Sequence, residues 1–143
     1  MRLRMVATAV LAAAVSLGMV GGAYASDASQ AFGVWSNPKN SVHVEIRPCG
    51  VVDHACGVVV WANEKAQQDA KKGGTDALVG LQLFRDMVRG ANGVWAGRVF
   101  VPDLNRTFSG TAEAIGGKEL RARGCFLRII CRSQIWNRID APA

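Results

Sequence analysis

The chain has 143 residues, half of them hydrophobic, and a formal net charge of +6 from 17 Lys and Arg against 11 Asp and Glu residues. This length suits one domain that can bury a core of its own. The mildly basic balance is too weak to indicate a nucleic-acid-binding protein, and four Cys point away from a reducing cytosol.

Residues 1–25 have the pattern of a secretory signal peptide. Arg2 and Arg4 precede an apolar stretch rich in Ala, which ends in the cleavage-site sequence Ala23-Tyr24-Ala25. Cleavage would leave one domain, 26–143, with Lys plus Arg lowered from 17 to 15 against 11 acids, a net charge of +4. An uncleaved membrane anchor is the alternative, but the dominance of Ala and Gly favours cleavage. We therefore expect a periplasmic or secreted protein with no membrane span after cleavage.

Beyond the signal, short runs of β-branched and aromatic residues alternate with turn residues, and no segment shows helical periodicity over three turns. Val42 to Arg47 alternates apolar and polar residues, whereas Cys56 to Ala62 is almost continuously apolar, which suits a strand covered on both faces. Asn63 to Ala77 is mostly polar and is predicted to be the one long loop. The predicted strands are 32–36, 42–47, 56–62, 78–85, 94–101, 106–113, 118–126 and 131–139.

Eight strands joined mostly by hairpins predict an all-β fold, a single up-and-down antiparallel barrel whose closure removes exposed sheet edges. A β-sandwich is the alternative, although the short connections match a meander better than a Greek key. A barrel of eight strands is either filled by side chains or holds one small ligand. The sequence does not decide between a filled interior and one that holds a ligand.

The two ends of this domain carry residues suited to closing a barrel. Trp35 near the start is a large rigid body that can plug the base, and Arg138 from the last strand can lie across its ring as a cation–π lid. Gly33 allows the backbone to pass close to its neighbour. We predict that Gly33, Trp35 and Arg138 together close the base of the barrel.

All four Cys lie in the expected mature chain, so two disulfides are predicted. Of three possible pairings we favour Cys49 with Cys56 and Cys125 with Cys131, because each pair brackets a short segment that can turn back. The second pair requires a turn near residue 128, since six extended residues span about 20 Å and a disulfide needs Cα atoms within about 7 Å.

Signals of catalysis and metal binding are weak. Asp53 and His54, between the first two Cys, would suggest a zinc site in a reducing compartment, but disulfide formation removes both thiolates. His43 lies on the polar side of its strand, and the sequence holds no nucleophile elbow and no glycine-rich phosphate loop. We predict no catalytic residue, no metal and no cofactor, with an uncharacterised hydrolase as the less favoured alternative.

Arginines gather in the last two predicted strands. Arg121 and Arg123 alternate along one strand, and Arg132 and Arg138 along the next. Guanidinium groups so arranged can bind carboxylate or phosphate groups, although a solvated strand face is the plainer interpretation.

Large aromatic residues provide the candidate ligand pocket: Trp61, Trp95, Phe100 and Phe108. The leading hypothesis is an exported barrel that binds a hydrophobic or amphipathic small molecule. The second is a module with a filled core that presents its basic strands to an anionic envelope surface, with salt-sensitive association. The sequence indicates neither the ligand nor the oligomeric state.

As a set, the motifs of the mature chain resemble an exported bacterial family known only as domain of unknown function 2147. The resemblance implies a lipocalin-like barrel with room for an apolar ligand, and no settled activity. One departure is that Leu104, Asn105 and Arg106 follow the Pro102-Asp103 turn, where the family usually places a Gly and a Lys. The matching residues are Gly33, Trp35, Val44, Glu45, Ile46, Cys49, Gly50, Cys56, Gly57, Leu78, Val79, Gly80, Trp95, Gly97, Pro102, Asp103, Leu120, Gly124, Cys125, Cys131, Arg132, Ser133, Gln134, Trp136 and Arg138.

Overall fold

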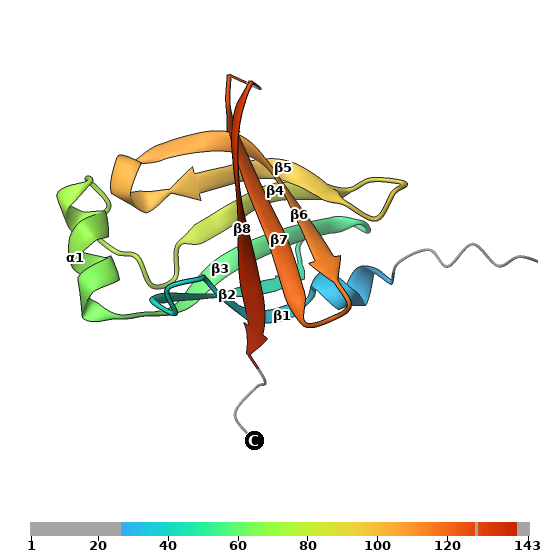
Figure 1. Ribbon diagram of the computed structural model, residues 1–143, viewed down its shortest axis with the longest axis horizontal. Coiled ribbons are helices and arrows are strands. Elements are labelled where there is room, and N and C mark those ends of the chain that lie inside the picture. The colour runs from blue at the N-terminus through green and yellow to red at the C-terminus, as the bar shows by residue number, and fades with distance from the viewer. Residues whose placement is uncertain (1–26, 128, 140–143) are drawn as a thin grey trace, which may run out of the picture.

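The computed structural model describes residues 27–127 and 129–139, which form a closed antiparallel barrel (Figure 1). Each of eight strands pairs with the next, and the last returns to the first, which confirms the predicted up-and-down fold. The predicted signal peptide lies outside the described residues. The strands are β1 (Gly33–Ser36), β2 (Val42–Pro48), β3 (His54–Ala62), β4 (Gln82–Arg89), β5 (Trp95–Val101), β6 (Arg106–Ile115), β7 (Glu119–Phe126) and β8 (Ile130–Ile139).

Among the described residues, three short helices accompany the barrel: η1 (Ala28–Ala31) before β1, α1 (Glu64–Lys72) between β3 and β4, and η2 (Pro102–Leu104) between β5 and β6. No helix in the described part of the chain is long and apolar enough to cross a membrane.

The barrel interior is lined by apolar side chains from every side of the sheet. Trp35, Phe84 and Leu120 are among its largest fully buried residues, because strand alternation points them inward. Phe84 also meets Trp136 of β8 edge-on, with ring centroids 5.8 Å apart. Contacts between strands far apart in sequence therefore hold the core together.

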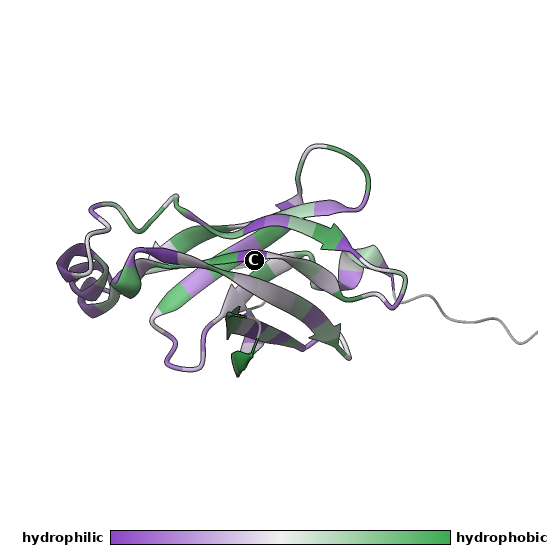
Figure 2. Cartoon of the chain, turned by 90° about the horizontal axis from the view of Figure 1, so that it is seen from above, coloured by the Kyte–Doolittle hydropathy of each residue, from purple (hydrophilic) through white to green (hydrophobic). Residues whose placement is uncertain are grey.

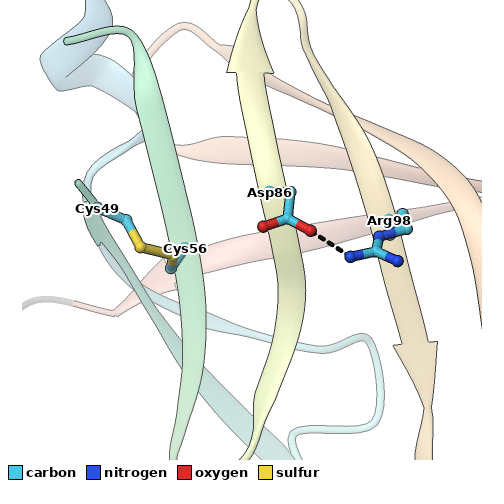
Figure 3. Close-up of a disulfide and its surroundings, with 4 residues drawn as sticks. All are labelled: Cys49, Cys56, Asp86 and Arg98. Carbon is cyan, nitrogen blue, oxygen red and sulfur yellow. Dashed lines mark hydrogen bonds and ion pairs between the residues drawn. A yellow bond between two sulfur atoms is a disulfide. The ribbon is translucent and has the colours of Figure 1, made fainter. Parts of the chain in front are cut away.

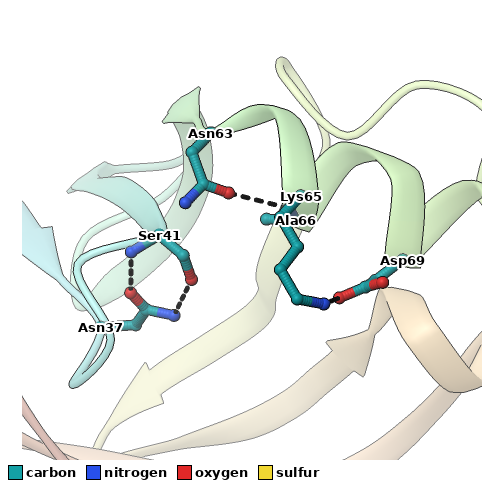
Figure 4. A network of polar contacts seen from close by, with 6 residues as sticks. All are labelled: Asn37, Ser41, Asn63, Lys65, Ala66 and Asp69. Atoms are coloured by element: carbon teal, nitrogen blue, oxygen red, sulfur yellow. Dashed lines mark hydrogen bonds and ion pairs between the residues drawn. The ribbon is translucent and has the colours of Figure 1, made fainter.

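The prediction of a single long loop after β3 is wrong, because α1 occupies its first half. The Asn63 side chain caps this helix by accepting a hydrogen bond from the Ala66 backbone N–H at 2.8 Å, and Lys65 pairs with Asp69 one turn later at 2.6 Å (Figure 4). Ala70 is its only buried residue, and the helix is almost entirely hydrophilic (Figure 2). A helix this polar lacks the apolar period by which sequence patterns indicate helices.

The fourth strand begins at Gln82, four residues after its predicted start. Leu78 is buried with 4% of its surface exposed, but it anchors a turn, since Gly80 has a φ of +90° and the Leu81 N–H bonds to the Leu78 carbonyl. The sequence pattern correctly indicated that Leu78 is buried, but it wrongly placed Leu78 in a strand.

Both favoured disulfides are present. Cys49 and Cys56 are joined with a Cα–Cα distance of 5.5 Å (Figure 3), and Cys125 and Cys131 with 4.0 Å. Near the first, Asp86 of β4 forms an ion pair with Arg98 of β5 (Figure 3). Residue 128, where a turn was predicted, lies outside the described residues, but the chain reverses around it: the Ile129 N–H bonds to the Phe126 carbonyl.

Candidate functional site

The base of the barrel brings together residues from both ends of the domain. The Arg138 guanidinium carbon lies 4.2 Å from the centre of the Trp35 ring. Its three nitrogens donate to three backbone carbonyls, those of Gly117 at 2.6 Å, Phe32 at 2.7 Å and Gln30 at 2.5 Å. With each nitrogen so used, Arg138 ties η1 and the β6–β7 turn to β8 and is suited to structure rather than to binding a ligand.

Gly33 is required here for two separate reasons. Its φ of +123° lies in the region that side chains disfavour, and a β-carbon at this position would collide with the nearest Arg138 nitrogen. Trp35 itself is fully buried and donates its indole N–H to the Ala31 carbonyl at 2.9 Å. Arg138 thus lies against both Gly33 and Trp35, the other two residues predicted for base closure.

The four aromatic residues predicted to form a pocket differ in burial and in the ring or side chain that each one contacts. Trp95 and Phe100 are buried, Phe108 is half-buried, and Trp61 keeps 43% of its surface exposed. Each has a different neighbour: Phe32 for Trp95, Arg85 for Phe100, Phe126 for Phe108 and His43 for Trp61.

A small cleft of about 110 Å³ lies near the base, between η1, the β4–β5 turn and β6. Its lining combines Trp95 and two alanines with two acidic residues. Glu113, one of them, is already 3.3 Å from an Arg121 nitrogen. The lining residues are Asp27, Gln30, Ala31, Asn92, Gly93, Trp95, Glu113 and Ala114.

His43 sits in a polar network at the opposite end of the barrel. Its Nε2 lies 2.7 Å from the Asn40 side-chain oxygen, which also accepts from the Ser36 hydroxyl at 2.9 Å, and its ring lies against Trp61 with centroids 4.4 Å apart. Partial burial lowers the pKa of His43 below its usual value. In these contacts His43 meets an amide oxygen rather than a hydroxyl, so the arrangement is not that of a nucleophile with its base.

The last hairpin, formed by β7 and β8, extends past the point where β8 stops pairing with β1. β7 and β8 pair from Glu119 with Asn137 up to Phe126 with Ile130, whereas β8 pairs with β1 only over Asn137–Ile139. We call residues 121–127 and 129–135 the β7–β8 arm. Along the arm β6 pairs with β7 up to Cys125, but β1 does not pair with β8, and the end of the arm projects beyond the other strands (Figure 1).

The end of this arm is apolar and exposed. Phe126, Leu127, Ile129 and Ile130 expose 46%, 72%, 83% and 63% of their surfaces, and we call these four residues the apolar tip. The Cys125–Cys131 disulfide closes the hairpin directly beneath them. Hairpin turns are normally polar, so an exposed apolar run is unusual at this position.

Exposed arginines flank the apolar tip on both faces of the arm. Arg123 lies opposite Ser133 in the strand pairing and Arg132 opposite Gly124, which places these two guanidinium groups on opposite faces. The sequence from Leu120 to Ile139 holds five Arg and no Asp or Glu. The arm is thus both apolar at its end and strongly positive along its length.

Comparison with family models finds a match over residues 33–138 to a family described as uncharacterized proteins conserved in bacteria, DUF2147. The chain belongs to the DUF2147 family. The matched span of this DUF2147 protein runs from Gly33 to Arg138, so it includes both sides of the base closure. No curated protein and no solved structure matches the chain.

Sequence reasoning singled out the arginines of this DUF2147 protein but missed the apolar tip. The available signal was the sequence Phe126-Leu127-Arg128-Ile129-Ile130 between two Cys, which is apolar where a turn requires polar residues.

Proposed function

We propose that this protein is an exported, peripheral module of the bacterial envelope that docks on an anionic membrane surface through the β7–β8 arm. The observation that carries the proposal is the position of the exposed apolar tip next to exposed arginines. Apolar side chains gain free energy by leaving water for the headgroup and acyl-chain boundary, and each nearby Arg adds about 1 kcal/mol at an anionic surface.

The disulfide beneath the tip supports the same function. A segment that is ordered before it binds loses less conformational entropy on docking than a flexible loop does. The Cys125–Cys131 bond holds β7 and β8 together where, in the described part of the chain, no strand pairs with the other side of β8. The arm therefore presents its apolar residues in a fixed arrangement.

Vesicle binding tests this proposal. We expect the protein, purified from an exporting host, to sediment with vesicles of an equal mixture of phosphatidylglycerol and phosphatidylcholine and to remain free with pure phosphatidylcholine. Binding should weaken as salt is raised to physiological strength, because salt screens exposed charges. Absence of binding to the anionic vesicles at low salt would refute the proposal.

The chain provides a matched control for the apolar tip. Val51 and Val52, with 67% and 87% exposed, occupy another turn bracketed by a disulfide. L127D/I129D should weaken vesicle binding by about tenfold or more, since charged side chains resist leaving water. V51D/V52D should bind like the wild-type protein, and equal losses in the two variants would contradict docking through the arm.

An amphipathic small molecule in the cleft beside Trp95 is a second candidate function. The cleft lining combines Trp95 with two acidic residues, Asp27 and Glu113, which suits a ligand with an apolar body and a positively charged end. A native mass spectrum of the protein from its own host would reveal a bound molecule as an extra mass that organic extraction removes. A bare polypeptide mass would remove support for this candidate.

A further inference from the structure

One side of β8 lacks a partner strand along the arm. The Arg138 N–H donates to the Lys118 carbonyl at 2.8 Å, and the β7–β8 register is regular from there to the tip. Residues of β8 therefore point their backbone groups alternately toward β7 and away from it. Those that point away in the arm are Cys131, Ser133 and Ile135.

On the outer side, β1 supplies partners for β8 only as far as Asn137, which lies opposite Ser36. Within the described part of the chain, no strand pairs with β8 on this side between Ile130 and Ile135. Three N–H and three C=O groups thus form an open ladder, which we call the β8 edge. Proteins usually protect such edges with proline, a bulge or a covering segment, because an open edge pairs readily with another chain.

We propose that the β8 edge binds an extended acidic segment of a partner polypeptide, which adds to the sheet as a further strand. The backbone ladder from Cys131 to Ile135 has room for about five residues, or roughly 17 Å of strand. This inference goes beyond membrane docking, because it rests on the flank of the arm and not on the apolar tip.

The positive charge of the arm favours an acidic segment as the added strand. Arg132 is exposed on β8 itself, and Arg123 is exposed beside Ser133 on the neighbouring strand. An acidic strand would place carboxylates directly next to Arg132 on one face, with Arg123 adding positive charge one strand further away on the other face. A second copy of this chain would instead place Arg132 near its own counterpart, and like charges across a sheet are unfavourable.

Amide hydrogen exchange, measured by NMR, tests the β8 edge directly. In the free protein the amides of Cys131, Ser133 and Ile135 should exchange quickly, while those of Arg132 and Gln134 stay protected by β7. As probe we would use a blocked seven-residue peptide of alternating Val and Glu. It should slow exchange at the three edge amides by about tenfold at saturation, and its Val and Lys counterpart should not.

Two variants make the test specific. Ser133→Pro removes an N–H that points away from β7, so it should weaken peptide binding by about tenfold, while Ser133→Ala should bind like wild type. Arg132→Glu leaves the backbone unchanged and should reverse the preference from the Glu to the Lys peptide, which keeps the test valid if the proline variant fails to fold.

Several outcomes would overturn this proposal. Slow exchange at the three edge amides in the free monomer would mean that they already have partners. Failure of the Glu peptide to slow them would exclude an acidic strand, and concentration-dependent self-association lost in Ser133→Pro would assign the edge to a second copy. Vesicle binding is a separate readout, so either proposal can fail while the other stands.

Discussion

Arg138 connects three segments of backbone through a single side chain and forms no ion pair with an acidic residue of 27–127 or 129–139. Arg138→Ala would leave the carbonyls of Gln30, Phe32 and Gly117 without their charged donor and remove the cation–π contact with Trp35. Hydrogen bonds to charged groups contribute roughly 1.5–3 kcal/mol each, although not additively, so we expect a loss of about 3 kcal/mol or more in the free energy of unfolding. Denaturant unfolding measures it. Arg123→Ala, at an exposed site, is the control, and an Arg138→Ala protein that unfolds like wild type would refute base closure.

His43 gives a prediction about pH. Burial lowers its pKa in the folded state below its usual value of 6.5. The unfolded chain therefore takes up the proton first as the pH falls, so the stability that neutral His43 contributes is present above pH 6.5 and is lost below it. NMR titration should place the His43 midpoint below 6.5, and Trp61→Ala, which uncovers the ring, should raise it. A midpoint unchanged in Trp61→Ala would show that Trp61 does not cause the shift.

At the scale of elements, the two disulfides bracket segments of similar length but differ in surroundings. Removing either pair as C49A/C56A or C125A/C131A should lower the free energy of unfolding by about 2 kcal/mol, from loop entropy alone. Only C125A/C131A should also speed amide exchange at the end of the arm and weaken vesicle binding. Among the described strands β6 pairs with β7 only up to Cys125, so beyond this disulfide β7 and β8 have only each other as partners. Equal vesicle binding by the two variants would show that the disulfide does not order the apolar tip.

The sequence predicted helices and strands correctly where an element buries one face, and it predicted them wrongly where the element buries little. Val42 to Arg47 shows clean alternation because β2 is covered on one side only, and its position is predicted to within one residue. Helix α1 packs little beyond Ala70, so its sequence reflects helix propensity and a cap rather than an apolar period. Leu78 caused the opposite error. Its side chain is buried, which suggested a strand, but the residue lies in a turn.

At the scale of the whole molecule, the candidate site depends on where one strand stops relative to another. Ile130 and Arg132 lie on the face of β8 that Trp136 turns into the core, yet they are exposed because β1 ends at Ser36. Their local sequence contains no sign of this. The contact of Arg138 with Trp35 was predictable because these are unusual residues at the two ends of the domain, whereas the arm results from unequal strand lengths.

Closure of the barrel joins residues that are distant in the chain. We therefore predict that the order of the strands along the chain can be permuted without loss of the fold. Val34 pairs with Ile139 and Ser36 with Asn137, which brings the two ends of the domain together. A circular permutant with a Gly and Ser linker from residue 139 to residue 27, and new ends between Asn92 and Gly93 in the β4–β5 turn, should keep every strand pair. We expect its unfolding, measured by circular dichroism, to be cooperative, with a midpoint within about 10 °C of that of the natural chain, because exposed turns tolerate new ends.

A second permutant, opened between Ala122 and Arg123, interrupts β7 in the middle of its pairing with β6 and β8 and should not fold. If the two permutants behaved alike, closure between β1 and β8 would not be what makes this chain one cooperative unit.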